Sequence, residues 1–156
     1  MGRYNRTITI DVTPTITAGA YSANDVIGGL QTISITAGSG GVIRRINIAD
    51  DDSEAAAMKL YIFDQLPTTT IADNAAFAPV IADLKKLIDV VTIIAGDYVT
   101  VNSNDYVIKR DLNIDYDADN PTDAVTSTFY VYAVVTATPT YTATSDLTFR
   151  YTVWID

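Results

Sequence analysis

The sequence has no cysteine and no histidine, and its single glutamate is Glu54. Without cysteine there is no disulfide framework, no thiol nucleophile and no cysteine-ligated zinc. Without histidine the chain lacks the commonest general base and the commonest transition-metal ligand. We therefore expect a protein that is not an enzyme and that uses no cofactor.

Basic residues are scarce, and long apolar runs are missing. Ten Lys and Arg against 19 Asp and Glu give a formal net charge of −9. Such acidity opposes binding to nucleic acid and to anionic membranes. No stretch reaches the ~18 apolar residues of a membrane-spanning helix, and the N-terminus lacks the apolar segment of a signal peptide. We expect a protein that stays in the cytoplasm or joins an assembly there.

Residues that favour β-structure are abundant. The chain of 156 residues contains 22 Thr and 10 Tyr, and 48% of it is hydrophobic. β-branched and aromatic side chains suit a pleated, half-buried surface. A chain of this length is typical of one domain and buries enough surface to fold without a disulfide or a metal. We expect an N-terminal strand or arm over Met1–Gly19 and a β-sandwich over Ala20–Asp156.

Alternating side chains predict eight to ten strands. In the stretch Asp146–Ile155 the apolar residues occupy every second position, and Thr148, Arg150 and Thr152 fall between them. Met58–Phe63 is apolar on both faces, which predicts a central strand. The other predicted strands are Thr7–Val12, Gln31–Thr36, Val42–Ala49, Val90–Ile94, Tyr98–Val101, Tyr106–Ile108 and Thr128–Ala137. The fold class is therefore all-β, a β-sandwich or a jelly-roll-like Greek key.

Several segments interrupt this pattern. The glycines of Ala37–Gly41 predict a hairpin turn, and no Lys-Ser/Thr pair follows them as in a phosphate loop. Asp50–Glu54 reads as an exposed acidic loop. Asp73–Ile88 predicts one or two short helices, interrupted by Pro79, with Asp73 and Asp83 as candidate N-caps.

The acidic stretch after Asn113 is a candidate calcium site. Asp115, Asp117 and Asp119 occupy alternate positions, a spacing that suits oxygen coordination of calcium. The EF-hand pattern nevertheless fails, because Asn120 stands in place of its glycine and Thr126 in place of its bidentate glutamate. A solvated acidic loop is the alternative.

Paired carboxylates raise the possibility of a glycoside hydrolase, which needs two carboxyl groups across a cleft. The acidic residues here lie beside Gly, Asn and Pro, where a solvated turn residue is the ordinary explanation. Exposed aromatic residues are candidates for function, because Tyr and Trp anchor many protein interfaces and stack on sugars. The alternative is that they pack in the core and across strands. The interface candidates are Tyr4, Tyr21, Tyr141 and Trp154, and Trp154 is out of phase with the inward residues of the last strand.

Three segments together resemble a known group of proteins. They are AYSANDVIGG (Ala20–Gly29), the run from Ile43 through Asp50 to Leu60-Tyr61-Ile62-Phe63 and Pro67, and the stretch from Thr138-Pro139-Thr140-Tyr141 through Ser145-Asp146-Leu147. In this order they resemble small virion structural proteins of tailed bacteriophages. Within that group the chain is most similar to capsid cement (decoration) proteins.

The resemblance implies a location and partners. A decoration protein typically assembles as a homotrimer on the capsid surface and contacts the major capsid protein. It bridges neighbouring capsid subunits, and many weak contacts across a shell gain strength from multivalency. The alternative is a carbohydrate- or receptor-binding module of a phage tail or head fibre.

Overall fold

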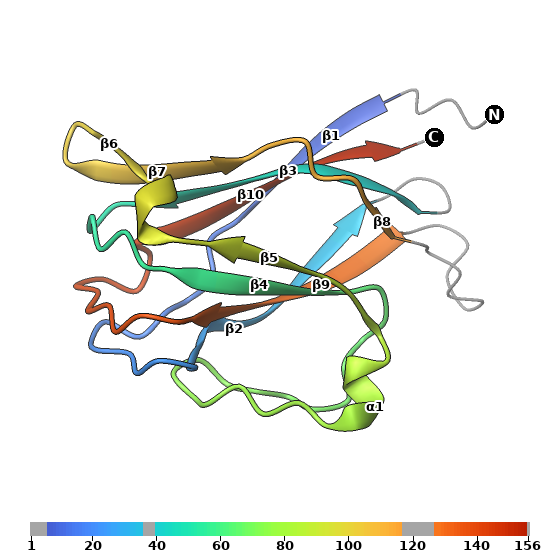
Figure 1. Cartoon of the computed structure of the whole chain (residues 1–156), viewed down its shortest axis with the longest axis horizontal. Coiled ribbons are helices and arrows are strands. Elements are labelled where there is room, and N and C mark those ends of the chain that lie inside the picture. Colours follow the sequence, from blue (N-terminus) through green and yellow to red (C-terminus); the bar gives the residue numbers. More distant parts are fainter. Residues whose placement is uncertain (1–5, 36–39, 117–126, 156) are drawn as a thin grey trace.

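In a computed structural model of the protein, which describes residues 6–35, 40–116 and 127–155, two antiparallel sheets pack face to face (Figure 1). The larger sheet has the order β1 (Arg6–Val12), β10 (Leu147–Ile155), β3 (Gly41–Asp50), β7 (Asn104–Lys109), β6 (Val99–Val101), and β8 (Ile114–Tyr116) pairs with β3 beyond the end of β7. The smaller sheet has the order β2 (Val26–Ile35), β9 (Ser127–Val135), β4 (Met58–Phe63), β5 (Leu87–Ile93). The prediction of an all-β sandwich is confirmed.

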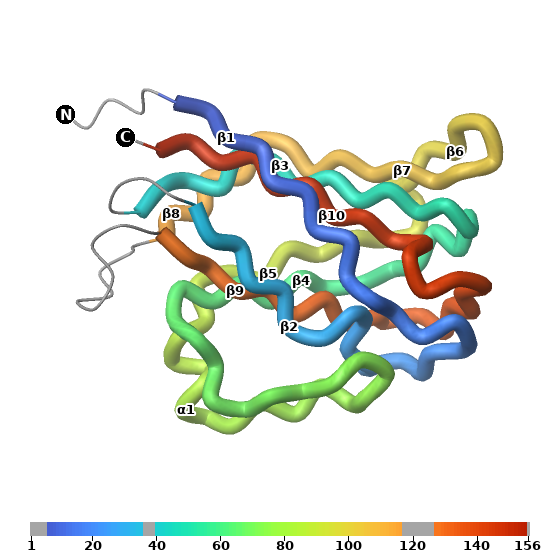
Figure 2. Tube along the Cα trace, turned by 180° about the vertical axis from the view of Figure 1, so that it is seen from behind, coloured from blue at the N-terminus to red at the C-terminus, as the bar shows by residue number. Residues whose placement is uncertain are grey.

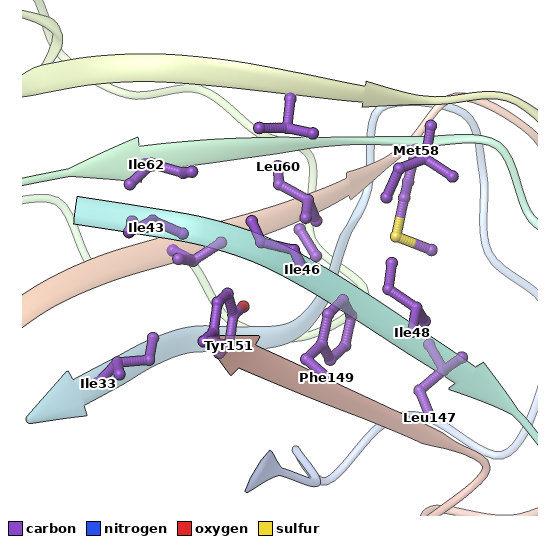
Figure 3. Packing of buried hydrophobic residues seen from close by; sticks show 14 of the residues in the cluster. Ile33, Ile43, Ile46, Ile48, Met58, Leu60, Ile62, Leu147, Phe149 and Tyr151 are labelled. Atoms are coloured by element: carbon purple, nitrogen blue, oxygen red, sulfur yellow. The ribbon is translucent and has the colours of Figure 1, made fainter. Parts of the chain in front are cut away.

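The core between the sheets follows directly from the alternation of side chains. The inward residues of β10 are all completely buried: Leu147, Phe149, Tyr151, Val153 and Ile155. Opposite them lie residues such as Met58, Leu60 and Ile62 of β4, as Figure 3 shows. Burying each large apolar side chain contributes about 1.5–3 kcal/mol, so this cluster dominates the stability of the sandwich.

The N-terminal segment is part of the sandwich from Arg6 onward. All residues of β1 pair with β10, from Arg6 opposite Ile155 to Val12 opposite Phe149. The chain then crosses to the smaller sheet, where Ile16 is buried and its N–H donates to the carbonyl oxygen of Thr144 at 3.0 Å. The predicted arm is therefore an edge strand followed by a crossing segment, as the blue trace in Figure 2 shows.

The hairpin predicted at Ala37–Gly41 is wrong, although residues 36–39 themselves lie outside the described residues. The strand before it, β2, pairs with β9 in the smaller sheet, and the strand after it, β3, pairs with β10, β7 and β8 in the larger one. A glycine-rich segment permits a tight turn, but it permits a crossing between sheets equally well, because glycine places no steric demand on either path.

The segment Asp73–Ile88 contains one short helix, as predicted, but the predicted N-caps and the end of the helix are wrong. Within the described ranges there is one short α-helix, α1 (Ile81–Leu84), and one turn of 3₁₀-helix, η1 (Ala95–Asp97). Asp73 caps no helix, Asp83 lies inside α1 rather than before it, and Leu87 already begins β5. Neither helix of the described residues is long and apolar enough to span a membrane.

Candidate contact surface

The two outer faces of the sandwich differ in what covers them. The segment 64–86, between β4 and β5, runs beneath the smaller sheet (Figure 1). Its Phe77 packs against Tyr61 and Tyr132, with ring centroids 4.4 and 5.7 Å away, and its Ile71 is buried in the same cluster. The smaller sheet is therefore covered by the chain itself.

A buried carboxylate anchors this covering segment. Asp83 accepts hydrogen bonds from the backbone N–H groups of Thr68 (2.7 Å) and Thr69 (2.8 Å) and from the Thr68 hydroxyl (2.8 Å). Although burial opposes ionisation, these bonds hold the pKa of Asp83 well below its usual range. The Tyr132 hydroxyl adds a second anchor, because it donates to the carbonyl oxygen of Thr69 at 2.9 Å.

Asp73 fastens the middle of the segment. Its carboxylate accepts from the Thr17 hydroxyl (2.6 Å), the Tyr21 hydroxyl (2.7 Å) and the backbone N–H of Gly28 (2.6 Å). Gly28 has a left-handed φ of 76°, and an added Cβ would lie 2.5 Å from Pro14. Asp73 was expected to cap a helix, but it joins the crossing segment and β2 to the covering segment.

The outer face of the larger sheet is open among the described residues. We call it the outer face, and it consists of the side chains that alternate with the core residues. It comprises Thr7, Thr9 and Asp11 of β1, Thr148, Arg150, Thr152 and Trp154 of β10, Val42, Arg44, Arg45, Asn47 and Ala49 of β3, Asp115 of β8, Tyr106 and Ile108 of β7, and Val99 and Val101 of β6. Among these, Val42, Asn47 and Thr152 are buried by their neighbours, and the others are at least partly exposed.

A β-bulge brings two arginines to the outer face. Ile43 and Ile46 both point into the core, and the register with β10 shifts between Thr152 and Val153. Two consecutive residues, Arg44 and Arg45, therefore lie between inward positions, where regular alternation would allow only one. The bulge therefore places two positive charges at this end of the outer face, where Asp115, opposite Val42, contributes one negative charge.

Trp154 stands beside these arginines. Its side chain is 39% exposed, and the guanidinium carbon of Arg44 lies 4.3 Å from the centroid of its ring. Arg44 also donates to the Asn113 Oδ1 at 2.9 Å, and Arg45 donates to the Thr152 hydroxyl at 3.3 Å. The cation–π contact and the hydrogen bond to Asn113 therefore fix the orientation of the Arg44 and Trp154 side chains before any partner binds.

A shallow hollow of about 180 Å³ lies farther along the outer face. Its lining residues are Asp11, Asn47, Ala49, Tyr106, Thr148 and Arg150. Arg150 donates two hydrogen bonds to Asp11, and these bonds lower the pKa of that carboxyl. The one carboxylate of the hollow is thus held ionised by an arginine, which suits it to binding polar groups rather than to transferring protons.

Among the four aromatic interface candidates, only Trp154 lies on a surface that the structure describes. Tyr21 and Tyr141 are 2% and 1% exposed and form an edge-to-face pair with centroids 6.1 Å apart. They are core residues, because their apolar neighbours enclose both rings, and they offer nothing to a partner. Tyr4 lies outside the described residues.

The predicted acidic loop is partly buried. Asp50 is completely enclosed, and its carboxylate accepts from the backbone N–H groups of Asp52 and Ala55, both at 3.1 Å. Asp52 and Glu54 accept from the backbone N–H groups of Thr142 (2.8 Å) and Thr140 (2.9 Å). Asp51, Ser53 and Glu54 are exposed, as expected, but Asp50 is not, and the carboxylates of Asp52 and Glu54 hold two loops together.

The calcium candidate is not supported by the described part of the chain. Asp115 lies on β8 with an exposed side chain, and Asp117 and Asp119 fall outside the described residues. No group of three or more Asp, Glu, His or Cys side chains in residues 6–35, 40–116 and 127–155 is arranged to hold a metal ion.

Sequence reasoning missed most of the outer face. Arg44, Arg45, Asn47 and Tyr106 lie on predicted strands, but only the register between strands shows that they are neighbours. The local signal that was available is the spacing of Ile43 and Ile46, which breaks the period of two. No protein-family model matches the chain, and no curated protein has a significantly similar sequence.

Proposed function

We propose that this chain is a virion structural protein of the capsid cement (decoration) type. It bridges neighbouring subunits of the major capsid protein on the surface of a tailed phage head and resists their separation under the pressure of the packaged genome. The proposal includes assembly as a homo-oligomer and no binding to nucleic acid or membrane. It rests on the sequence resemblance together with one structural observation, the open outer face of the larger sheet.

The outer face has the properties of a contact surface. The covering segment conceals the opposite side, so a partner that binds a broad, rigid face meets the larger sheet. Arg and Trp are the residues most often found at the centre of binding energy in interfaces, and Arg44 and Trp154 stand together there in a fixed orientation. A specific contact needs about 1,000 Å² of total buried area, which the broad face of a six-stranded sheet can supply.

Binding to capsids tests the proposal. The wild-type protein should co-sediment with expanded heads of the phage that encodes it. A variant with both Arg44→Ala and Trp154→Ala should bind at least about tenfold more weakly, because two anchors of the interface are lost. Lys85→Ala is the control, because it removes one exposed positive charge on the far side, after α1.

Two results would overturn the proposal. In the first, the wild-type protein fails to bind expanded heads at any concentration tested. In the second, the double variant binds as tightly as the wild type while the control loses binding, which would move the contact to the opposite side of the molecule.

The second candidate function is a carbohydrate- or receptor-binding module of a tail or head fibre. The observation that favours it is the hollow, which combines the ring of Tyr106 with polar groups of Asn47 and the Asp11–Arg150 pair. Aromatic rings stack on sugars while such polar groups bind hydroxyls. A glycan array distinguishes the two functions: this candidate predicts hits that Tyr106→Ala removes, and an array without hits rejects it.

A further inference from the structure

The free edge of β1 is the most open edge of the sandwich. Within the described ranges, β1 pairs with β10 alone, and its other side faces no strand. In Figure 2, β1 (dark blue) runs in front of the rest of the chain. A row of backbone N–H and C=O groups is therefore available to a further strand.

The inward side chains of β1 are incompletely buried. Ile8, Ile10 and Val12 pack against the main core, yet each remains partly exposed. The inward residues of the neighbouring β10 are completely buried, and so is Ile33 on the edge strand β2. The inward side chains along β1 therefore remain partly exposed to solvent, and a strand added to this edge would bury them.

The other edges are protected by features that β1 lacks. β6 has only 3 residues. β2 carries a register shift with Gly28 and Gly29 in the left-handed region, and β5 carries a register shift beside Asp89. Bulges, short strands and charges are the usual means by which proteins prevent edge pairing. β1 has 7 regular residues and no proline, glycine or bulge.

We infer that β1 pairs antiparallel with β1 of a second copy of this chain, about a two-fold axis that passes beside Ile10. Residues that face each other across an antiparallel pair must lie on the same side of the sheet. With Ile10 opposite its own copy, Ile8 faces Val12 of the partner subunit and Thr9 faces Asp11 of the partner subunit. In this register Ile8, Ile10 and Val12 each face an aliphatic residue of the partner subunit. No two residues of like charge face each other.

The two-fold pairing joins two larger sheets into one continuous sheet. A continuous sheet keeps both outer faces on the same side, so the pair would present two copies of the outer face to one partner surface. The pairing itself does not depend on the proposed function. The advantage of bivalent binding to a capsid does rest on it, since two linked contacts bind far more tightly than either alone.

The net negative charge of each copy makes the pairing depend on ionic strength. Each copy carries a net charge of −9, so the copies repel each other at low ionic strength. Salt shortens the Debye length from about 30 Å at 0.01 M to about 8 Å at 0.15 M. The edge contact is small, so we expect self-association that depends on concentration and that strengthens as salt is added.

Disulfide trapping tests the pairing and its register. Because the chain has no cysteine, a single cysteine can bond only to its copy. Directly opposite residues have Cα atoms about 4.5–5.5 Å apart, within the range that a disulfide spans. Ile10→Cys should therefore form a covalent dimer on mild oxidation. Thr7→Cys, exposed on the same strand, is the control, because it would lie roughly 20 Å from its copy.

A second pair of variants tests the contact without oxidation. Sedimentation velocity from micromolar to millimolar protein should show dimers that Ile10→Lys abolishes, because an inward lysine charges the apolar contact. Thr9→Lys adds the same charge but faces Asp11 of the partner subunit, so dimers should persist. Circular dichroism checks that both variants fold.

Three outcomes would overturn the inference. They are a wild-type protein that remains monomeric at millimolar concentration in high salt, equal cross-linking of Ile10→Cys and Thr7→Cys, and oligomers that Ile10→Lys leaves unchanged while it folds normally. Capsid binding by the wild-type protein is measured separately. Its loss would contradict the proposed function and leave the pairing of β1 unaffected.

Discussion

Arg150 donates hydrogen bonds to both carboxylate oxygens of Asp11, at 2.6 and 2.7 Å, and so joins the last strand of the sandwich to the first. The two residues lie directly opposite each other in the register of β1 and β10, at the β1 edge of the outer face. The pair therefore connects two features on which the functional proposals depend, the open face and the open edge.

The Asp11–Arg150 pair should contribute little to overall stability, because both side chains are about half exposed. Asp11→Ala should lower the melting temperature by no more than about 2 °C, and this loss should shrink in high salt. Hydrogen exchange of the β1 amides should accelerate, since the edge strand is held less firmly. Thr9→Ala is the control, and a loss greater than about 8 °C would contradict an exposed pair.

Removing Asp83 should release the covering segment. In Asp83→Ala, the backbone N–H groups of Thr68 and Thr69 lose their buried acceptor. We expect the melting temperature to fall by at least about 5 °C and the amides of Thr68 and Thr69 to exchange much faster. Asp89→Ala, in which the lost carboxylate bonds only the adjacent N–H of Val90, should behave like the wild type. Equal effects of the two variants would show that Asp83 is no anchor.

Asp50 should make the protein less stable as the pH rises through mildly acidic values. Burial raises the pKa of Asp50 from its usual 3.8 to about 6, against the backbone N–H groups that lower it. The folded state then holds this proton more tightly than the unfolded state. The contribution of Asp50 to the free energy of unfolding is therefore fully present below pH about 4 and is lost as the pH rises to about 6.

The contributions of other carboxyl groups do not obscure this window. Hydrogen bonds from Lys109, from Arg150 and from Thr68 and Thr69 lower the pKa values of Asp97, Asp11 and Asp83, so the stability that these carboxylates contribute is lost mainly below pH about 4. Melting temperatures from pH 4 to 7 should thus fall for the wild type and change less for Asp50→Asn. Asp51→Asn, at the exposed neighbour, should keep the wild-type profile. Identical profiles for wild type and Asp50→Asn would refute the assignment.

Trp154 is the single tryptophan of the chain, so its fluorescence reports the stacking by Arg44 directly. In Arg44→Ala one face of the indole ring should become more accessible, and acrylamide should quench it more strongly. The free energy of unfolding should change by less than about 1 kcal/mol, because the contact is at the surface. Arg45→Ala should leave quenching unchanged, since that side chain reaches Thr152 instead. Equal quenching in all three proteins would mean that Arg44 does not cover the ring.

The strands could be predicted because alternation is a local property. The inward set of β10, from Leu147 to Ile155, and the central position of β4 both followed from residues within one segment. The assignment of strands to sheets could not be read in this way. Ala37–Gly41 has the composition of a hairpin turn, and only the pairing of β2 with β9 shows that the chain changes sheets there.

The roles of the acidic residues were the least predictable part. Asp50, Asp73 and Asp83 have the same local signature as solvated turn residues or helix caps. Asp50 and Asp83 are buried and Asp73 is half-buried, and their carboxylates accept from backbone N–H groups that the fold brings to them: Asp73 binds Gly28, which is 45 residues away, and Asp83 binds Thr68, which is 15 residues away. Among the aromatic candidates, Trp154 could be predicted to face outward, because it does not fall on the inward positions of the last strand. The burial of Tyr21 and Tyr141 could not be predicted, because it depends on contacts between distant loops.

Hydroxyl-radical footprinting of the protein bound to expanded phage heads tests the central claim most directly, because it reports which side chains the partner covers. The outer face should be protected, with oxidation of Trp154 and Tyr106 strongly reduced relative to the free protein, while the exposed Leu66 and the exposed Ile81 of α1 stay reactive. Protection of Leu66 and Ile81 with Trp154 and Tyr106 unchanged would contradict the account.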